Sequence, residues 1–339
     1  VLADGIVAQI FNQPNAREIL SVMASVSKNS NPNPENLPDF LRDYFDSTAK
    51  LPAWHSKRKI KISSKFFCQN TQPIMLCLMM LSLPYCYAAG ADAEVLLLSQ
   101  RIGNDTRKRL SETGQFIFDV MAEDAFEHSG CGIRSIQKVR LMHAIVRYHL
   151  QKNALWNNEN GLAINQEAMA GTNLAFSLMI LRGLQRQNIS FSADEENAYI
   201  HRWNIIGFMM GIDEDLLFDT VKQTAFLEEK IRTRHFIKSK AGIELTAALI
   251  NTAKDFFPDK PADKFLFPIM SHLLGRKVAE ILEIPYSEEN NEVMALLKLK
   301  NTFQQVFNIQ FGKVNLAMQK QMQLENEGKR ADFKSPYKL

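Results

Sequence analysis

The stretch KVRLMHAIVRYHL, residues 138–150, places basic side chains inside an otherwise apolar run and decides how the chain folds. Residues three and four apart share one face of a helix, so Arg140, His143 and Arg147 form a single polar stripe, whereas His149 lies off it. The side chains between them are mostly apolar, which predicts a helix buried on most sides. Because burying charge costs free energy, this stripe indicates an anion or a metal nearby.

Helical periodicity recurs along the rest of the chain, while strict two-residue alternation is scarce. One start is marked by Ser192 and Glu195, which form a capping box. The sequence therefore predicts an all-α fold with a single multi-helix domain. The expected helices span roughly 74–83, 91–101, 105–121, 133–151, 165–186, 192–210, 213–232, 240–254, 261–281 and 290–325.

Composition places the chain among ordinary globular proteins, with 46% hydrophobic and 23% charged residues among 339. The net charge of +3 and the absence of a basic stripe interleaved with aromatics argue against nucleic-acid binding. None of the four cysteines forms a CxxC pair, so the sequence does not support a thiol zinc site. Free thiols favour a reducing compartment, and we expect a cytoplasmic protein.

The Pro- and Asn-rich segment NSNPNPENLP, residues 29–38, separates a first helical segment from the rest. We expect an N-terminal helical extension and linker over 1–50, the main domain over 51–325 and a polar tail over 326–339. The apolar run between Pro73 and Pro84 is shorter than the ~20 residues of a membrane span, so no span is predicted. The first 30 residues show no signal-peptide pattern, although the chain starts at Val1 and an upstream segment could have been removed.

Several common catalytic signatures are missing from the sequence. There is no P-loop, GxGxxG, GxSxG or HExxH motif, and no Glu lies three residues before a His, as di-iron bundles require. A cofactor held between helices is then a natural candidate, and haem supplies both an iron for His143 and propionates for arginines. Two alternatives stand beside it: His143 as a hydrogen-bonded core residue, and arginines paired with acids of a neighbouring helix.

An upstream segment, RKRLSETGQFIFDVM at 107–121, adds a second polar stripe. Arg109 and Thr113 lie one turn apart, so their side chains share a face and would meet a bound dioxygen or an anionic group. The alternative is a surface arginine and a threonine that bonds its own backbone.

The pairing of RxxxT at Arg109 and Thr113 with RLMHAIVR at 140–147 resembles the catalytic domain of the rubber oxygenases. That family includes latex clearing proteins and the ER-bound oxygenase of the mycophenolic acid pathway. Thr113 precedes His143 by 30 residues, as in the latex clearing branch. The segments INQEAMAGTNLAFSLMILRGLQR, 164–186, and DEENAYIHRWNIIGFMMGIDEDLL, 194–217, resemble the wider family too.

This resemblance implies an all-α, globin-like core that binds haem b. Carried over by position, it makes His143 the proximal ligand of the iron and places Arg140 and Arg147 beside it in support of haem binding. Arg109 and Thr113 would belong to the distal helix. The implied substrates are O2 and an apolar, isoprenoid-like alkene.

Two departures from the family pattern concern the distal side. The latex clearing branch has a Lys just before the Thr, where this chain has Glu112, so ligation by Lys is not expected. A carboxylate base is also expected upstream, but the spacing falls on Ala93, between Asp92 and Glu94. Either acid would serve after a shift of one residue, and the alternative is that both are solvated acids at a helix start.

The sequence thus predicts a haem-dependent oxygenase that cleaves a C=C bond. An alternative function is a non-catalytic helical protein of the same fold that holds haem or a lipid. A haem-free interaction protein is the third hypothesis.

Overall fold

The computed structural model of the chain describes residues 2–30, 37–99, 106–256 and 264–286, with three isolated positions at 320, 323 and 330. Across these residues the regular structure is helical, apart from one isolated antiparallel bridge between Ala89 and Phe236. This confirms the prediction of an all-α fold. The α-helices are α1 (Leu2–Phe11), α2 (Ala16–Ser25), α3 (Asp39–Ser47), α4 (Lys57–Gln69), α5 (Thr71–Cys77), α6 (Leu83–Tyr87), α7 (Gly90–Leu98), α8 (Thr106–Met121), α9 (Gly132–Lys152), α10 (Gln166–Phe176), α11 (Leu178–Arg186), α12 (Ala193–Met210), α13 (Val221–His235), α14 (Lys240–Phe256), α15 (Leu266–Leu274) and α16 (Arg276–Ile281).

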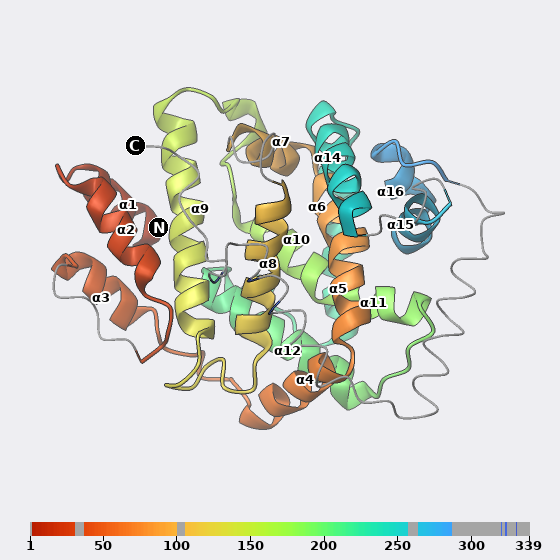
Figure 1. Cartoon of the computed structure of the whole chain (residues 1–339), viewed down its shortest axis with the longest axis horizontal. Coiled ribbons are helices and arrows are strands. Elements are labelled where there is room, and N and C mark those ends of the chain that lie inside the picture. The colour runs from red at the N-terminus through yellow and green to blue at the C-terminus, as the bar shows by residue number, and fades with distance from the viewer. Residues whose placement is uncertain are drawn as a thin grey trace.

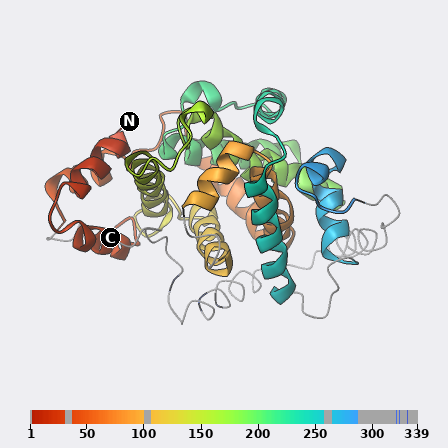
Figure 2. The same cartoon turned by 90° about the horizontal axis from the view of Figure 1, so that it is seen from above.

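Helices α8, α9 and α14 stand roughly upright beside the run formed by α5 and α6, and α4 and α12 cross at one end of them (Figure 1). Seen from above, α9, α8 and α14 follow one another across the molecule (Figure 2). The largest apolar cluster joins α4, α5, α6, α8, α11, α12 and α15. The middle of the chain therefore builds one connected core.

The buried guanidinium of Arg202 ties three helices of this core together. It donates to the carbonyl oxygens of Val120 at 2.7 Å and Ala122 at 2.6 Å, and to Ser64 Oγ of α4 at 2.8 Å. These carbonyls belong to the C-terminal end of α8, where the helix dipole is negative and stabilises a cation. Burial nevertheless lowers the pKa of Arg202 to about 9. The contact fixes α8, the predicted distal helix, against α4 and α12.

The N-terminal helices α1, α2 and α3 pack against the outer side of α9 (Figure 1). Leu141, Ala144 and Ile145 of α9 are fully or almost fully buried in this contact. Phe11 of α1 stacks on Tyr148, with ring centroids 4.6 Å apart. The N-terminal helices thus share an apolar cluster with α9. The predicted domain boundary near residue 50 stays a prediction.

Two of the predicted helices are wrong, because the structure divides each of them into two. The expected helix 165–186 is interrupted at Ser177, whose φ of −107° and ψ of −83° leave the helical region and separate α10 from α11. The expected helix 261–281 is interrupted at Gly275, whose φ of +81° lies in the left-handed region that favours glycine.

One further predicted helix starts later than expected, and another lies almost entirely outside the described residues. The expected helix 213–232 begins as a 3-10 turn, Glu214–Leu216, and its α-helical part starts at Val221. The capping box of Ser192 and Glu195 is confirmed. The expected helix 290–325 and the tail 326–339 lie outside the described residues, apart from the isolated positions.

Sequence periodicity missed α4, although this helix has a regular buried face. Ile60, Ser63, Ser64 and Phe67 recur at the spacing of one helix side and are buried. Two of these four are serines, whose hydroxyl groups both donate to the carbonyl oxygen of Ile60. A helix that buries hydroxyl groups in this way shows little apolar periodicity in its sequence.

No single helix in the described part of the chain combines the length and hydrophobicity needed to cross a bilayer. One pair, Lys57–Gln69 followed by Thr71–Tyr87, passes only when both helices are counted, and it bends by 85°. Within the apolar run 73–84, side chains such as Ile74, Cys77 and Leu81 are fully buried.

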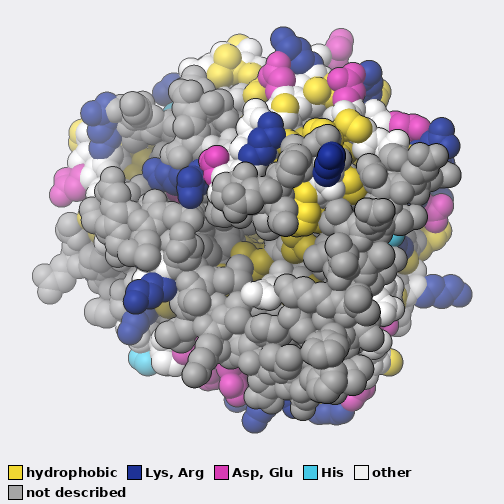
Figure 3. All heavy atoms as spheres, turned by 45° about the vertical axis from the view of Figure 1, so that its right-hand side comes forward, with side chains coloured by type: hydrophobic (Ala, Val, Ile, Leu, Met, Phe, Trp, Pro, Cys, Tyr) yellow, Lys and Arg dark blue, Asp and Glu magenta, His cyan; other side chains and the backbone are white. Residues whose placement is uncertain are grey.

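The face drawn in Figure 3 carries Lys and Arg side chains interspersed with Asp and Glu around its rim. Hydrophobic side chains gather nearer its centre, where the surface is hollowed. Mixed charge of this kind agrees with the small net charge of +3.

Candidate functional site

A cavity of about 280 Å³ lies between α6, α7, α8, α9, α10 and α12. Most of its surface is apolar, and the polar groups in its wall are few. The apolar lining includes Leu83, Val95, Leu96, Phe116, Val139, Met142, Val146, Phe176, Ile206 and Met210. The polar lining includes Cys86, Asp92, Arg109, Thr113, His143, Thr172 and Asn173. An apolar cavity with a few convergent polar groups is the usual form of a ligand or cofactor site.

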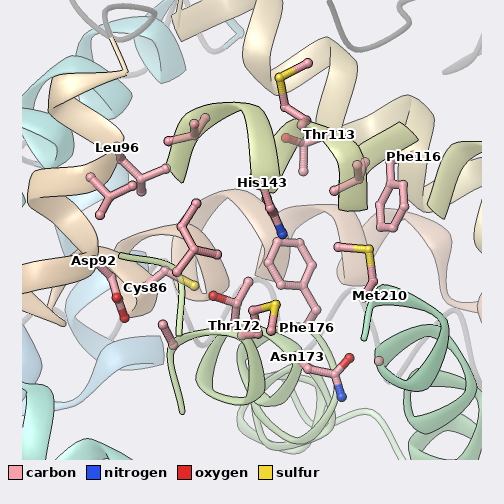
Figure 4. A pocket seen from close by; sticks show the side chains of 18 of the residues that line it. Cys86, Asp92, Leu96, Thr113, Phe116, His143, Thr172, Asn173, Phe176 and Met210 are labelled. Carbon is pink, nitrogen blue, oxygen red and sulfur yellow. The ribbon is translucent and has the colours of Figure 1, made fainter. Parts of the chain in front are cut away.

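His143 projects from α9 toward the middle of this cavity, above Phe176 (Figure 4). Its Nδ1 atom is buried and has no hydrogen-bond partner among the described residues. Burial and the nearby charge of Arg147 lower its pKa to about 4, so the imidazole is neutral at pH 7. A neutral imidazole has a free lone pair and is the form that ligates metals.

Helix α8, which packs against α9, contributes Arg109, Thr113 and Phe116 to the cavity wall. These positions repeat at four and three residues, so one face of α8 meets the cavity. Glu112 is almost fully buried but is not part of the cavity wall. The structure thus brings Arg109 and Thr113 to the same cavity as His143, as the sequence predicted, and directs Glu112 elsewhere.

Of the two candidate acids on α7, Asp92 lines the cavity and Glu94 does not. Burial raises the pKa of Asp92 to about 6, against the opposing effect of His235. Glu94 instead accepts a hydrogen bond from Asn160 Nδ2 at 3.2 Å. Ala93, between them, is fully buried in a cluster with Ala241.

Arg140 and Arg147 share α9 with His143 but are not part of the cavity wall. Arg140 donates to the carbonyl oxygen of Met209 at 3.1 Å, near the C-terminal end of α12. Arg147 forms an ion pair with Asp4 of α1, with Nη2 2.7 Å from Oδ1. The two arginines of the predicted polar stripe are therefore compensated within the protein, Arg140 by the end of α12 and Arg147 by the carboxylate of Asp4.

The sequence did not predict several lining residues of the cavity, among them Cys86, Trp203, Thr172 and Asn173. The signal for the last two was present, since two adjacent polar residues interrupt the apolar part of α10. This signal was missed because the sequence predicted one continuous helix over 165–186, whereas the structure divides it at Ser177.

A group of three or more His, Cys, Asp or Glu side chains suited to a metal ion is absent from the described residues. His143 therefore stands as a lone imidazole in the cavity wall. A single imidazole is enough for a metal whose remaining ligands come with its cofactor, as in haem.

A family model described as "ER-bound oxygenase mpaB/B'/Rubber oxygenase, catalytic domain" matches residues 74–301. The chain belongs to this family. Cys86, Asp92, Arg109, Thr113, His143 and Thr172 all fall within the matched residues. The resemblance first seen in the sequence around Arg109, Thr113 and His143 is thereby confirmed.

Two individual proteins are also similar to this family member. A rubber oxygenase of Streptomyces sp. (strain K30) is 20% identical over 224 residues, which cover 63% of this chain and 53% of that protein. The match thus spans about half the length of the relative. A solved structure of a latex clearing protein in the closed state superposes with a TM-score of 0.80 at 18% identity, over 89% of this chain and 82% of that one. This likeness shows that the two chains share their helical fold.

Proposed function

We propose that the chain is a haem b-dependent oxygenase that uses O2 to cleave a C=C bond in an isoprenoid-like apolar substrate. The observation that carries the proposal is His143, a neutral imidazole that faces an apolar cavity and has an unpartnered buried Nδ1. Membership in an oxygenase family supports the reaction class. The apolar lining supports the substrate class, because an alkene offers no groups for polar side chains to bind.

The residues around the cavity fit a haem. His143 would hold the iron, since its imidazole is uncharged and its buried Nδ1, which has no partner among the described residues, is costly unless a bound group satisfies it. Among the described residues of the cavity wall, Arg109 is the one arginine, and it would pair with a carboxylate group there. When bound, haem would supply the redox chemistry that activates dioxygen.

Arg140 and Arg147 act on the site through the position of α9. Arg147 holds α9 against α1, and Arg140 holds it against the end of α12. Both contacts fix the rotation of α9, and with it the direction in which His143 points. We therefore propose that the two arginines support haem binding by positioning the helix.

The chain's own groups on the substrate side have separate tasks. Thr113 and Arg109 offer hydrogen-bond donors in the part of the cavity wall that α8 forms. Asp92 is the proposed base, since it lines the cavity and its raised pKa of about 6 suits proton exchange near neutral pH. The apolar walls exclude water. In the overall reaction each carbon of the double bond gains one oxygen atom of O2, so two carbonyl groups form without an external reductant.

Incubation of the purified, haem-loaded protein with a farnesyl-bearing alkene, first under argon and then with O2, tests the proposal. The expected products are fragments with a new ketone and a new aldehyde end, formed only after O2 is added. Unchanged alkene across a panel of isoprenoids, in a protein that retains haem, would favour the non-catalytic binding alternative.

A matched pair of variants assigns the acid. Asp92→Asn should slow the formation of carbonyl products strongly, because it removes the carboxylate that lines the cavity. Glu94→Gln should leave the rate close to that of the parent, since Glu94 is directed to Asn160. The opposite ranking of the two variants would overturn the assignment of Asp92.

A further inference from the structure

One side of the cavity brings three polar side chains together. Cys86 of α6, Asp92 of α7 and Thr172 of α10 lie together there, to one side of His143 (Figure 4). Asn173 and Met210 lie toward the other side. Three helices thus bring a thiol, a carboxyl and a hydroxyl group to one region of an apolar cavity.

The carboxyl group is the member of this cluster without a partner. Asp92 has no hydrogen bond and no ion pair with any residue in the described part of the chain. Cys86 and Thr172, in contrast, bond each other, and burial keeps the thiol protonated by raising its pKa to about 12. A neutral pair therefore stands next to an acid whose acceptor oxygens remain available.

Groups outside the cavity favour the charged form of Asp92. His235 lies where α13 ends, and the bridge between Ala89 and Phe236 holds that end beside the start of α7. His235 Nε2 is 2.6 Å from Glu167 Oε2, and Arg234 contacts the same carboxylate. The charge of His235 lowers the pKa of Asp92, and the titratable groups Cys86, Tyr87 and Arg109 line the same cavity. At neutral pH the carboxylate form therefore prevails despite its burial.

An ionised carboxylate in an apolar cavity is stabilised by any ligand that donates a hydrogen bond to it. We propose that Asp92 accepts a hydrogen bond from the hydroxyl head group of the ligand, and that this cavity takes an isoprenoid alcohol or phenol in preference to a plain hydrocarbon. The inference rests on the proposed function for the isoprenoid body of the ligand. Anchoring at one end would also fix which double bond of the chain lies in the middle of the cavity.

Geraniol and geranyl methyl ether are a matched pair of probes, because they share an apolar body and only geraniol has a hydroxyl hydrogen to donate. Their dissociation constants are measured by equilibrium dialysis against the haem-loaded protein under argon, so that no turnover occurs. The expected result at pH 7.5 is about ten-fold tighter binding of geraniol, the size of one hydrogen bond to a charged group. Equal binding of the two probes would overturn the inference.

Variants of the two neighbouring acids locate the effect. Asp92→Leu should bind both probes equally, and Asp92→Asn, which is isosteric and keeps one acceptor oxygen, should show a reduced preference. Glu94→Leu should keep the full preference, because Glu94 is not in the cavity wall. A preference that survives in both Asp92 variants would overturn the inference.

The pH dependence of the preference for geraniol gives an independent test. The preference for geraniol should diminish as the pH falls through about 6, since a protonated carboxyl group is a weaker acceptor and can itself donate to the ether oxygen. A preference independent of pH between 5 and 7.5 would contradict the role of Asp92. Because binding is measured without O2, a protein that prefers geraniol but never cleaves it would refute the proposed reaction alone.

Discussion

The two sides of α9 differ in what they contribute to the molecule. The outer side, with Leu141, Ala144 and Ile145, packs against the N-terminal helices, and the polar groups of this contact, such as Arg147 and Asp4, are paired with each other. The inner side holds His143 in the wall of a cavity, with a buried nitrogen that lacks a partner in the part of the chain that the structure describes. One side of a single helix therefore stabilises the fold, while the other side carries a group that costs stability until a ligand binds.

The largest expected effect comes from the outer side. Leu141→Ala removes a fully buried side chain from the contact with α1–α3 and should lower the free energy of unfolding by about 2–5 kcal/mol. Urea denaturation followed by circular dichroism measures it. Met142→Ala, on the inner side where the cavity already leaves free space, is the control and should cost less. Equal losses in the two variants would break the contrast between the sides.

The acid limb of the stability curve probes the inner side. His143 has a pKa of about 4 in the folded protein and about 6.5 when unfolded, so the unfolded chain binds the extra proton between these values. Stability of the haem-free protein should therefore be unaffected by this group above pH 6.5. It should fall by about 3 kcal/mol as the pH drops from 6.5 to 4. His143→Leu should lose this part of the pH dependence, and an unchanged acid limb in that variant would contradict the burial of a neutral imidazole.

The same variant should also change the stability of the haem-free protein at neutral pH. His143→Leu replaces an imidazole whose buried Nδ1 has no partner among the described residues, so the haem-free protein should gain about 1–3 kcal/mol of stability at pH 7.5. The measurement is the urea midpoint of haem-free parent and variant. A loss of stability comparable to that of Leu141→Ala would show that His143 is a structural core residue.

The smallest effect concerns the ion pair that joins the N-terminal helices to α9. Asp4→Asn removes one partner of Arg147 while the guanidinium keeps a weaker contact to the carbonyl oxygen of Ile164. Because Asp4 is partly exposed, the loss should be about 0.5–1 kcal/mol and should shrink in 1 M salt. Glu18→Gln on α2 serves as a surface control without measurable effect. A loss above 2 kcal/mol would mean that α1 depends on this pair more than on its apolar contact.

The sequence predicted the inner side of α9 better than the partners of its charges. Periodicity alone indicated a buried helix with His143 directed inward, because three- and four-residue spacing reports directly on helix faces. It could not show that Arg147 is compensated by Asp4, since 143 positions separate the two residues and no local pattern records the contact. The inference that two arginines on a buried stripe need an outside anion was therefore incomplete.

The choice between Asp92 and Glu94 was likewise outside the reach of the sequence. Successive residues of a helix differ by about 100° in direction, so the rotation of α7 decides which acid meets the cavity. That rotation is set by the burial of Ala93 against Ala241 of α14. Helix breaks at Ser177 and Gly275 were missed for a related reason, because tertiary packing and one left-handed residue interrupt segments whose periodicity continues.

The absorption spectrum of the purified protein after expression with excess haem precursor tests the central claim most directly. The parent and His149→Ala, a variant on the other side of α9 beside Phe11, should both show the intense Soret band of bound haem. His143→Ala should lose this band while keeping its helical circular dichroism. A full Soret band in His143→Ala, or a colourless parent protein after reconstitution with haem, would contradict the account.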